Sequence, residues 1–177
     1  MKFSKLLVDY KHAYINHRNI HYSMHQKLYQ MFEGNERILY DFNIDKGEIY
    51  VKHDIDPTLE KGFTISTKEL IVPTNGSIVM IDMLINPVKK VNGKRVLDDP
   101  YEWINKRNFG FDILDMNVSK DFDIDMSPKS TFNVPTYRYR IQAKITDSDT
   151  FSSYVENGIG KAKGMGCGLI KFIQLSN

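Results

Sequence analysis

The chain has 177 residues, of which 41% are hydrophobic and 26% are charged, with a formal net charge of +2. This is the balance of a soluble globular protein that is long enough to bury a core of its own. No apolar run approaches the ~20 residues that span a bilayer, and the single cysteine, Cys167, excludes an internal disulfide and a cysteine-based metal cluster. We therefore expect a cytoplasmic protein without a membrane segment.

The first half of the chain predicts the order strand, helix, strand, strand, short helical turn, strand. Apolar residues at helical spacing follow Asn19, which suits the N-cap position, and the turn between the two middle strands lies at Asp45-Lys46-Gly47. The expected elements are a strand over 2–10, a helix over 19–32, two strands within 37–54, and a helical turn followed by a strand within 56–70.

The second half repeats this order after the turn-rich stretch IVPTNGS. Its expected elements are strands over 78–85, 111–119, 136–146 and 168–175, and helices over 98–108 and 149–158. Two consecutive βαββαβ units predict an α+β fold of tandem ferredoxin-like (RRM-like) domains. We expect the domains to span residues 1–73 and 78–177.

The charges are unevenly distributed along the chain. Seven Lys/Arg residues face three acids from Lys129 to the end, and six face three from Asn86 to Arg107, whereas residues 109–126 hold five aspartates and one lysine. A basic face would suit a polyanionic partner, although ordinary solvated surface is the alternative.

A glycine-rich stretch, NGIGKAKGMGCGLIKF (residues 157–172), precedes the last apolar run. It fails the P-loop pattern because Gly160-Lys161 is followed by alanine and no glycine stands five residues earlier. It fails the dinucleotide fingerprint because Lys163 stands at the third glycine position and the stretch follows a helix. Such glycines instead let backbone N–H groups approach phosphates; the alternative is a helix C-cap at Gly158 followed by a mobile loop.

The helix expected over 19–32 separates an apolar face from a face that carries chemistry. At ~100° per residue, Tyr22, His25 and Tyr29 share a direction roughly 120° from the apolar side. Histidine can give or take a proton near neutral pH. His25 and Tyr22 are therefore candidates to meet a ligand, and a structural or surface histidine is the alternative.

The same helix raises a metal-site alternative. His17, His21 and His25 are four residues apart, but no carboxylate stands at the spacing of the H-E-x-x-H motif, and the ring positions drift around the helix. We expect neither a metal nor another cofactor.

Four segments together resemble one protein family. GIGKAKGMGCGLIKF is similar to the C-terminal signature of the RAMP superfamily, most closely that of the CasE-type CRISPR repeat-processing endoribonucleases. HYSMHQKLYQMF resembles the first-helix motif Y-x-x-H-x-x-L, INPVKKVNGKRV the A-N-P-x-K segment with its following G-K-R, and YEWINKR the next helix. The resemblance runs from the first strand to the last.

The resemblance implies an activity and its residues. CasE-type enzymes cut the CRISPR repeat RNA (pre-crRNA) at the 3′ base of its hairpin without a metal, and remain bound to the crRNA beside other Cascade subunits. By carry-over, His25 is the general acid or base, and Tyr22 orients the scissile phosphate or shares the proton transfer. The expected RNA-binding residues are Lys89, Lys90, Lys94, Arg95, Arg138, Arg140, Gly158, Gly160, Lys161, Lys163, Gly164 and Gly166.

Some features leave alternatives open. Leu84 stands where the family usually has an arginine, so that contact is expected to be missing or supplied from elsewhere, for instance by Lys89. Tyr137 and Tyr139 could stack on bases, but strand tyrosines more often lie in the core. A non-catalytic RAMP subunit that binds crRNA is the rival function, and the lack of a clear RNP1 pattern argues against a generic pair of RRM domains.

Overall fold

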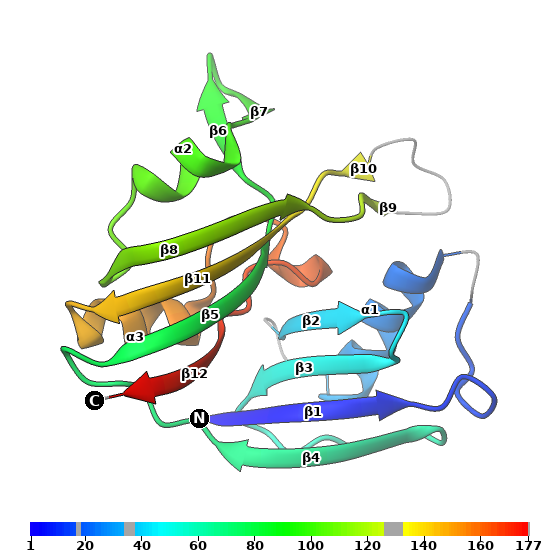
Figure 1. Cartoon of the computed structure of the whole chain (residues 1–177). Helices are drawn as coiled ribbons and strands as arrows, with labels where there is room; N and C mark the ends of the chain where they lie inside the picture. The colour runs from blue at the N-terminus through cyan, green and yellow to red at the C-terminus, as the bar shows by residue number, and fades with distance from the viewer. Residues whose placement is uncertain (17–18, 34–37, 126–132, 177) are drawn as a thin grey trace.

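The computed structural model of the chain describes residues 1–16, 19–33, 38–125 and 133–176. It contains two four-stranded antiparallel sheets, one from each half of the chain. Figure 1 shows the two sheets side by side, with α1 behind the first sheet and α3 behind the second. Each sheet therefore has one face covered by helices and one face open.

The first sheet has the strand order β2-β3-β1-β4. Its elements are β1 (Lys2–Val8), α1 (Ile20–Met31), β2 (Leu39–Asn43), β3 (Glu48–His53) and β4 (Phe63–Glu69). The second sheet has the equivalent order β12-β5-β11-β8, in which the last strand of the unit lies beside the first. The prediction of tandem ferredoxin-like units is therefore confirmed.

The second half contains more elements than the sequence predicts. They are β5 (Ile78–Ile85), β6 (Val88–Val91), β7 (Lys94–Leu97), α2 (Pro100–Asn105), β8 (Phe111–Lys120), β9 (Ile124–Asp125), β10 (Asn133–Val134), β11 (Tyr137–Ile145), α3 (Ser148–Asn157), the short 3₁₀ helix η2 (Lys163–Met165) and β12 (Lys171–Ser176). The β6–β7 hairpin projects beyond the sheet in Figure 1. This hairpin and the small β9–β10 pair were not predicted.

The expected helical turn between β3 and β4 is wrong. The fully described stretch between these strands contains no helix. Its backbone instead closes the end of α1, where the amide of Thr58 donates to the carbonyl of Met31 at 2.8 Å, and Glu60 forms an ion pair with Lys27 at 2.5 Å.

The helix α1 forms for the reasons that its sequence predicts. The side chain of Asn19 accepts a hydrogen bond from the amide of Tyr22 at 3.2 Å and so caps the helix. Met24, Leu28 and Met31 are buried against the covered face of the first sheet. The opposite side of α1 is left for other contacts.

The second sheet buries alternate residues in the same way. Tyr139 on β11 is fully buried, and its hydroxyl donates to the carbonyl of Pro100 at 2.8 Å. It therefore belongs to the core. The residues on the other face of β11, Arg138 and Arg140, point to the open side.

None of the described helices has the length and apolar character to span a membrane. The two sheets are joined through residues 70–77, where the amide of Leu70 donates to the carbonyl of Met1 at 3.1 Å. We keep residues 1–73 and 78–177 as the proposed extents of the two domains.

Candidate functional site

His25 lies on α1 between the first sheet and the glycine-rich loop. Its ring stacks on Tyr40 of β2, with centroids 6.2 Å apart and planes 26° apart, and lies 6.2 Å from the ring of Tyr29. It is half-buried, and this burial lowers the pKa of the imidazole below its ordinary value. His25 is therefore neutral at physiological pH, which leaves one ring nitrogen free to accept a proton.

Tyr22 shares the outer side of α1 with His25. It is 38% exposed, and its hydroxyl accepts a hydrogen bond from the side-chain amide (Nε2) of Gln26 at 3.2 Å. The predicted face of Tyr22, His25 and Tyr29 is confirmed as the side of α1 away from its buried residues. Tyr22 thus remains able to reach a ligand that approaches His25.

The glycine-rich loop packs against the same helix and strand. A Cβ at Gly164 would lie 3.9 Å from Cε1 of His25, and a Cβ at Gly166 would lie 3.0 Å from Cε2 of Tyr40. Gly166 also has φ of +86°, a conformation that favours glycine. The close approach of the loop to Tyr40 therefore depends on the missing side chain at Gly166, whereas a Cβ at Gly164 would make an ordinary van der Waals contact with His25.

The loop is anchored at both ends. Gly158 caps α3, and a Cβ there would lie 2.7 Å from Leu39. The amide of Gly168 donates to the carbonyl of Leu84 at 2.7 Å. The strand β12 begins at Lys171 and not at the predicted residue 168. The alternative of a cap followed by a mobile loop does not describe this segment, since its backbone is bonded to β5.

The two loop lysines have different surroundings. Lys161 is exposed, and its backbone forms a bridge with Asn86. The amine of Lys163 donates to the carbonyl of Asn157 at 2.7 Å and so ties η2 to the end of α3. Lys161 is therefore better placed than Lys163 to meet an anion. Gly160 borders Trp103, where a Cβ would lie 3.4 Å from the indole ring.

The basic run of residues 89–95 lies on the β6–β7 hairpin. Lys90, Lys94 and Arg95 are exposed, and the turn at Asn92-Gly93 has positive φ at both residues, as expected for a tight hairpin. Lys89 differs, because its amine pairs with the buried carboxylate of Asp98 at 2.7 Å. Lys90, Lys94 and Arg95 are therefore exposed on the hairpin, whereas Lys89 is paired with a buried acid.

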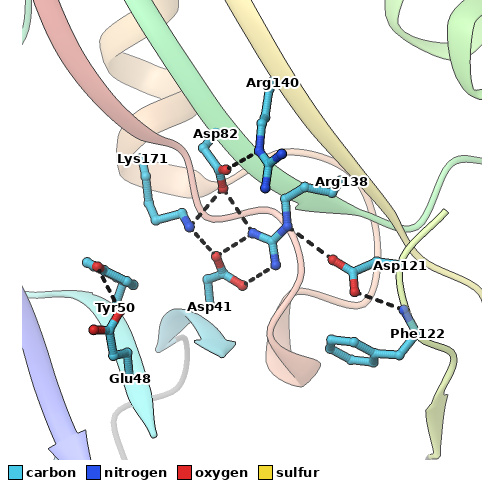
Figure 2. A network of polar contacts seen from close by, with 9 residues as sticks. All are labelled: Asp41, Glu48, Tyr50, Asp82, Asp121, Phe122, Arg138, Arg140 and Lys171. Carbon is cyan, nitrogen blue, oxygen red and sulfur yellow. Dashed lines mark hydrogen bonds and ion pairs between the residues drawn. The ribbon is translucent and has the colours of Figure 1, made fainter. Parts of the chain in front are cut away.

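Arg138 is enclosed by acids rather than exposed. Its guanidinium bonds Asp41 of β2 at 2.6 and 3.1 Å, Asp82 of β5 at 2.9 Å and Asp121 at 3.1 Å, as Figure 2 shows. Burial alone would lower the pKa of Arg138, but the three carboxylates raise it. Because its donors are used within the chain, we leave Arg138 out of the proposed RNA contacts.

Arg140 and Lys171 complete this group on the open face. Arg140 is 65% exposed and lies 3.5 Å from Asp82, whereas the amine of Lys171 contacts Asp41 at 2.5 Å and Asp82 at 2.8 Å. Burial would raise the pKa of Asp82, but Lys171 and Arg138 outweigh that effect and lower it. Arg140 remains available to a ligand.

Leu84, which replaces the family arginine, is buried with Ile124, Val134 and Cys167. It supplies no cation, and Lys89 is already paired with Asp98. Among the described residues, no group of three or more His, Cys, Asp or Glu side chains is arranged so that it could hold a metal ion. His17 lies outside the described residues, and His21 stacks on Phe122 at 4.5 Å.

Two residues of this site were not predicted from the sequence. Tyr40 and Asp41, on the edge strand β2, hold His25 and Arg138 respectively. Nothing in their local pattern marks them, since β2 reads as an ordinary strand. The signal that could have been used is an aspartate within a strand. If such an aspartate is buried, it requires a cation as its partner.

The family model described as CRISPR associated protein matches residues 1–173, and no curated protein sequence matches the chain. The structure resembles Cas6e from Escherichia coli K-12, at 22% identity and a TM-score of 0.78 over 99% of this chain and all of that one. It also resembles Cse3 from Thermus thermophilus bound to an RNA representing a pre-cleavage complex, at 20% identity and a TM-score of 0.78 over 97% of this chain and 98% of that one.

A third match is the CRISPR endoribonuclease Cse3 bound to a 19-nucleotide RNA, with 20% identity and a TM-score of 0.82 over 98% of this chain and 100% of that one. These likenesses extend over nearly the whole of each chain. They support the same tandem ferredoxin-like fold.

Proposed function

The chain belongs to the family of CRISPR associated proteins, and from this membership we propose that it is a metal-independent endoribonuclease of the CasE type. Its substrate is the CRISPR repeat RNA, cut at the 3′ base of the hairpin to release crRNA. The enzyme then stays bound to the hairpin as a subunit of a Cascade complex in the cytoplasm. The RNA-bound Cse3 structures and the surveillance-complex chain with a TM-score of 0.77 support this proposal.

The observation that carries the proposal is the meeting of His25 with the glycine-rich loop. A proton-transfer group and a stretch of glycine-rich backbone come from opposite ends of the chain and lie side by side, so that a Cβ at Gly164 would be 3.9 Å from Cε1 of His25. A phosphate that approaches the exposed Gly164 would therefore come close to the His25 imidazole. RNA cleavage needs this combination, because one group must move a proton while others hold the phosphate.

The chemistry requires one attack and two proton transfers. The 2′-OH of the nucleotide before the cut loses its proton, and its oxygen attacks the adjacent phosphorus. The bond from phosphorus to the 5′ oxygen breaks, and that oxygen takes a proton. The products are a 2′,3′-cyclic phosphate and a 5′-OH. Neutral His25 would serve as the base, or protonated His25 as the acid, while Tyr22 would orient the phosphate or share the proton transfer.

Around this centre, we propose that the exposed cations contact the RNA. Lys161 and the backbone of Gly164 lie at the centre, and the β6–β7 hairpin offers further charge farther out. A-form RNA presents its backbone and 2′-OH groups more readily than its base edges. A projecting ribbon of lysines and arginine suits such backbone contacts. Its exposed cations are Lys90, Lys94 and Arg95.

The test uses the protein with its own repeat RNA in EDTA under single-turnover conditions. We expect one cut with a 2′,3′-cyclic phosphate end, and we expect His25→Ala to slow it by about 10²–10⁴-fold. His12→Ala is the matched control, because His12 is exposed, lies outside α1 and bonds Asp9. A rate unchanged by His25→Ala would remove His25 from the mechanism.

The same experiment separates the rival function. A wild-type protein that binds the hairpin but leaves it intact would be a non-catalytic RAMP subunit. The replacement of the family arginine by the buried Leu84 is the observation in favour of that alternative. Hairpin affinity is therefore measured beside the cleavage rate.

A further inference from the structure

The open face of the first sheet carries two aromatic rings on its two central strands. Phe3 of β1 and Tyr50 of β3 have centroids 6.2 Å apart and planes 33° apart. Both are half-buried and lie on the face opposite α1, since their cross-strand neighbours are Lys52 and Lys5, whereas the alternate residues form the core. In RRM sheets, aromatic residues on the two central strands stack on unpaired bases.

The sequence of β3 retains part of the RNP1 pattern. Residues 46–53 read KGEIYVKH, which matches the pattern at the first basic residue, the glycine, the central aromatic residue and the valine. The pattern fails at three positions: Glu48 stands at the first aromatic position, Ile49 at the small-residue position and His53 at the last aromatic position. The pattern is therefore incomplete as a signature, but Tyr50 occupies its main stacking position.

A cavity of about 410 Å³ opens beside these rings, between the two sheets. Phe3, Tyr50 and Leu70 line it from the first half of the chain, and Met80, Phe172 and Ile173 from the second. Its walls are mainly apolar. This volume and lining suit the flat face of a nucleobase, which gains most from stacking when water is excluded.

Three cations border the cavity. Lys171 is held by Asp41 and Asp82, and its amine lies 4.9 Å from the centroid of the Tyr50 ring, as Figure 2 shows from close by. Arg140 is largely exposed, and Lys68 is exposed, with no ion pair among the residues that the structure describes. Asp82, the acid of this rim, is already neutralised by its cations.

We propose that this cleft is a second RNA site, which takes unpaired nucleotides by stacking a base on Phe3 and Tyr50 and placing phosphate near Lys68 and Arg140. If the proposed function holds, the nucleotides are the single-stranded part of the transcript beside the hairpin. An excess of cations over free acids at an aromatic cleft favours RNA over an apolar protein segment. The site is separate from His25, which lies with α1 on the covered side of the sheet.

The first test is fluorescence anisotropy with a fluorescein-labelled eight-nucleotide oligouridylate, which contains no hairpin. We expect the double variant Phe3→Leu/Tyr50→Leu to bind it at least about tenfold more weakly, because two stacking rings are lost while apolar volume remains. Tyr14→Leu is the control for the aromatic changes, since Tyr14 is 91% exposed outside the cleft. Lys11→Gln is the control for Lys68→Gln in the same way, and we expect only Lys68→Gln to weaken binding of the oligouridylate.

The second test is zero-length ultraviolet crosslinking of the wild-type protein to the oligouridylate, followed by peptide mass spectrometry, which needs no variant to fold. A uridine adduct on Phe3 or Tyr50 is expected. Adducts confined to the β6–β7 hairpin or the glycine-rich loop would overturn the proposal, as would unchanged affinity in the double variant. Loss of binding to a purified Cascade subunit with unchanged RNA affinity would identify a protein interface instead. Failure of the proposed nuclease function would appear separately, as an uncut hairpin.

Discussion

The imidazole of His25 is held by groups from three elements. Tyr29 lies beside it on α1, Tyr40 stacks on it from β2, and the backbone of Gly164 faces it from η2. Lys163, the nearby cation of η2, is bonded to the carbonyl of Asn157. Among the residues that the structure describes, burial is what lowers the pKa of His25, so neutral packing around the ring lowers its proton affinity.

This environment predicts the pH dependence of cleavage. The inflection in kcat/KM should lie below pH 6.5, because this parameter reports the free enzyme and the pKa of His25 is lowered by burial. If His25 is the base, the rate falls as the pH drops through the inflection; if it is the acid, the rate falls as the pH rises through it. A pH–rate series measures this, and NMR titration of the His25 ring gives the pKa directly. An inflection that persists in His25→Ala would belong to another group.

At the scale of elements, the covered face of the first sheet contains a chain of hydrogen bonds across three strands. The hydroxyls of Ser4 and Thr67 are 2.6 Å apart, Ser4 lies 2.6 Å from Nε2 of His53, and Nδ1 of His53 lies 2.8 Å from the carbonyl of Ile55. A carbonyl only accepts, so Nδ1 carries the proton and Nε2 accepts from Ser4. The neutral ring is therefore fully bonded, and burial lowers the pKa of His53.

The stability of the sheet should consequently depend on the protonation of His53. Its pKa is lower in the folded chain than in the unfolded one, so the unfolded chain binds more protons between the two values. The stabilisation is complete above about pH 6.5 and is lost as the pH falls through the folded value. We expect His53→Gln to flatten the fall in the free energy of urea unfolding between pH 7.5 and 5, relative to the wild-type protein. The same slope in the variant and the wild type would contradict this role.

Periodicity predicts the elements of this fold well where a single face is buried. The helix α1 and the strand β11 both follow from spacing and capping. The helical turn before β4 fails because its backbone is needed to close the end of α1. The β6–β7 hairpin reads only as a basic run, since both of its faces are exposed and no alternation of apolar residues marks it.

At the scale of the whole molecule, the site depends on contacts between distant segments. The sequence of the glycine-rich loop carries the family resemblance, and the sequence of α1 predicts the role of His25. Tyr40 lies against both, and this contact can be seen only in the folded structure. Arg138 shows the limit most clearly. Its alternation on β11 correctly places it on the open face, yet only the position of β2 reveals that Asp41 is its partner. Local sequence therefore gives the face of a residue and not its partner across the molecule.

The pairing of Asp41 with Arg138 and Lys171 links the edge of the first sheet to two strands of the second, β11 and β12. Asp41→Asn removes a buried negative charge, so that Arg138 and Lys171 each lose one of the carboxylates with which they pair. We expect it to lower the free energy of unfolding by about 3–5 kcal/mol, the usual cost of breaking a buried pair. Urea unfolding followed by circular dichroism measures this.

Asp45→Asn is the matched control, because Asp45 is exposed in the turn of the same β2–β3 hairpin, and it should change stability by less than about 0.5 kcal/mol. A double-mutant cycle with Arg138→Met then isolates the pair itself. If the ion group aligns the sheets, the effects of Asp41→Asn and Arg138→Met will be far from additive. Hairpin cleavage will also slow in Asp41→Asn although His25 is untouched, since Lys171, a partner of Asp41, lies at the end of the glycine-rich stretch. Additive effects with normal cleavage would mean that apolar packing alone sets the arrangement of the two sheets.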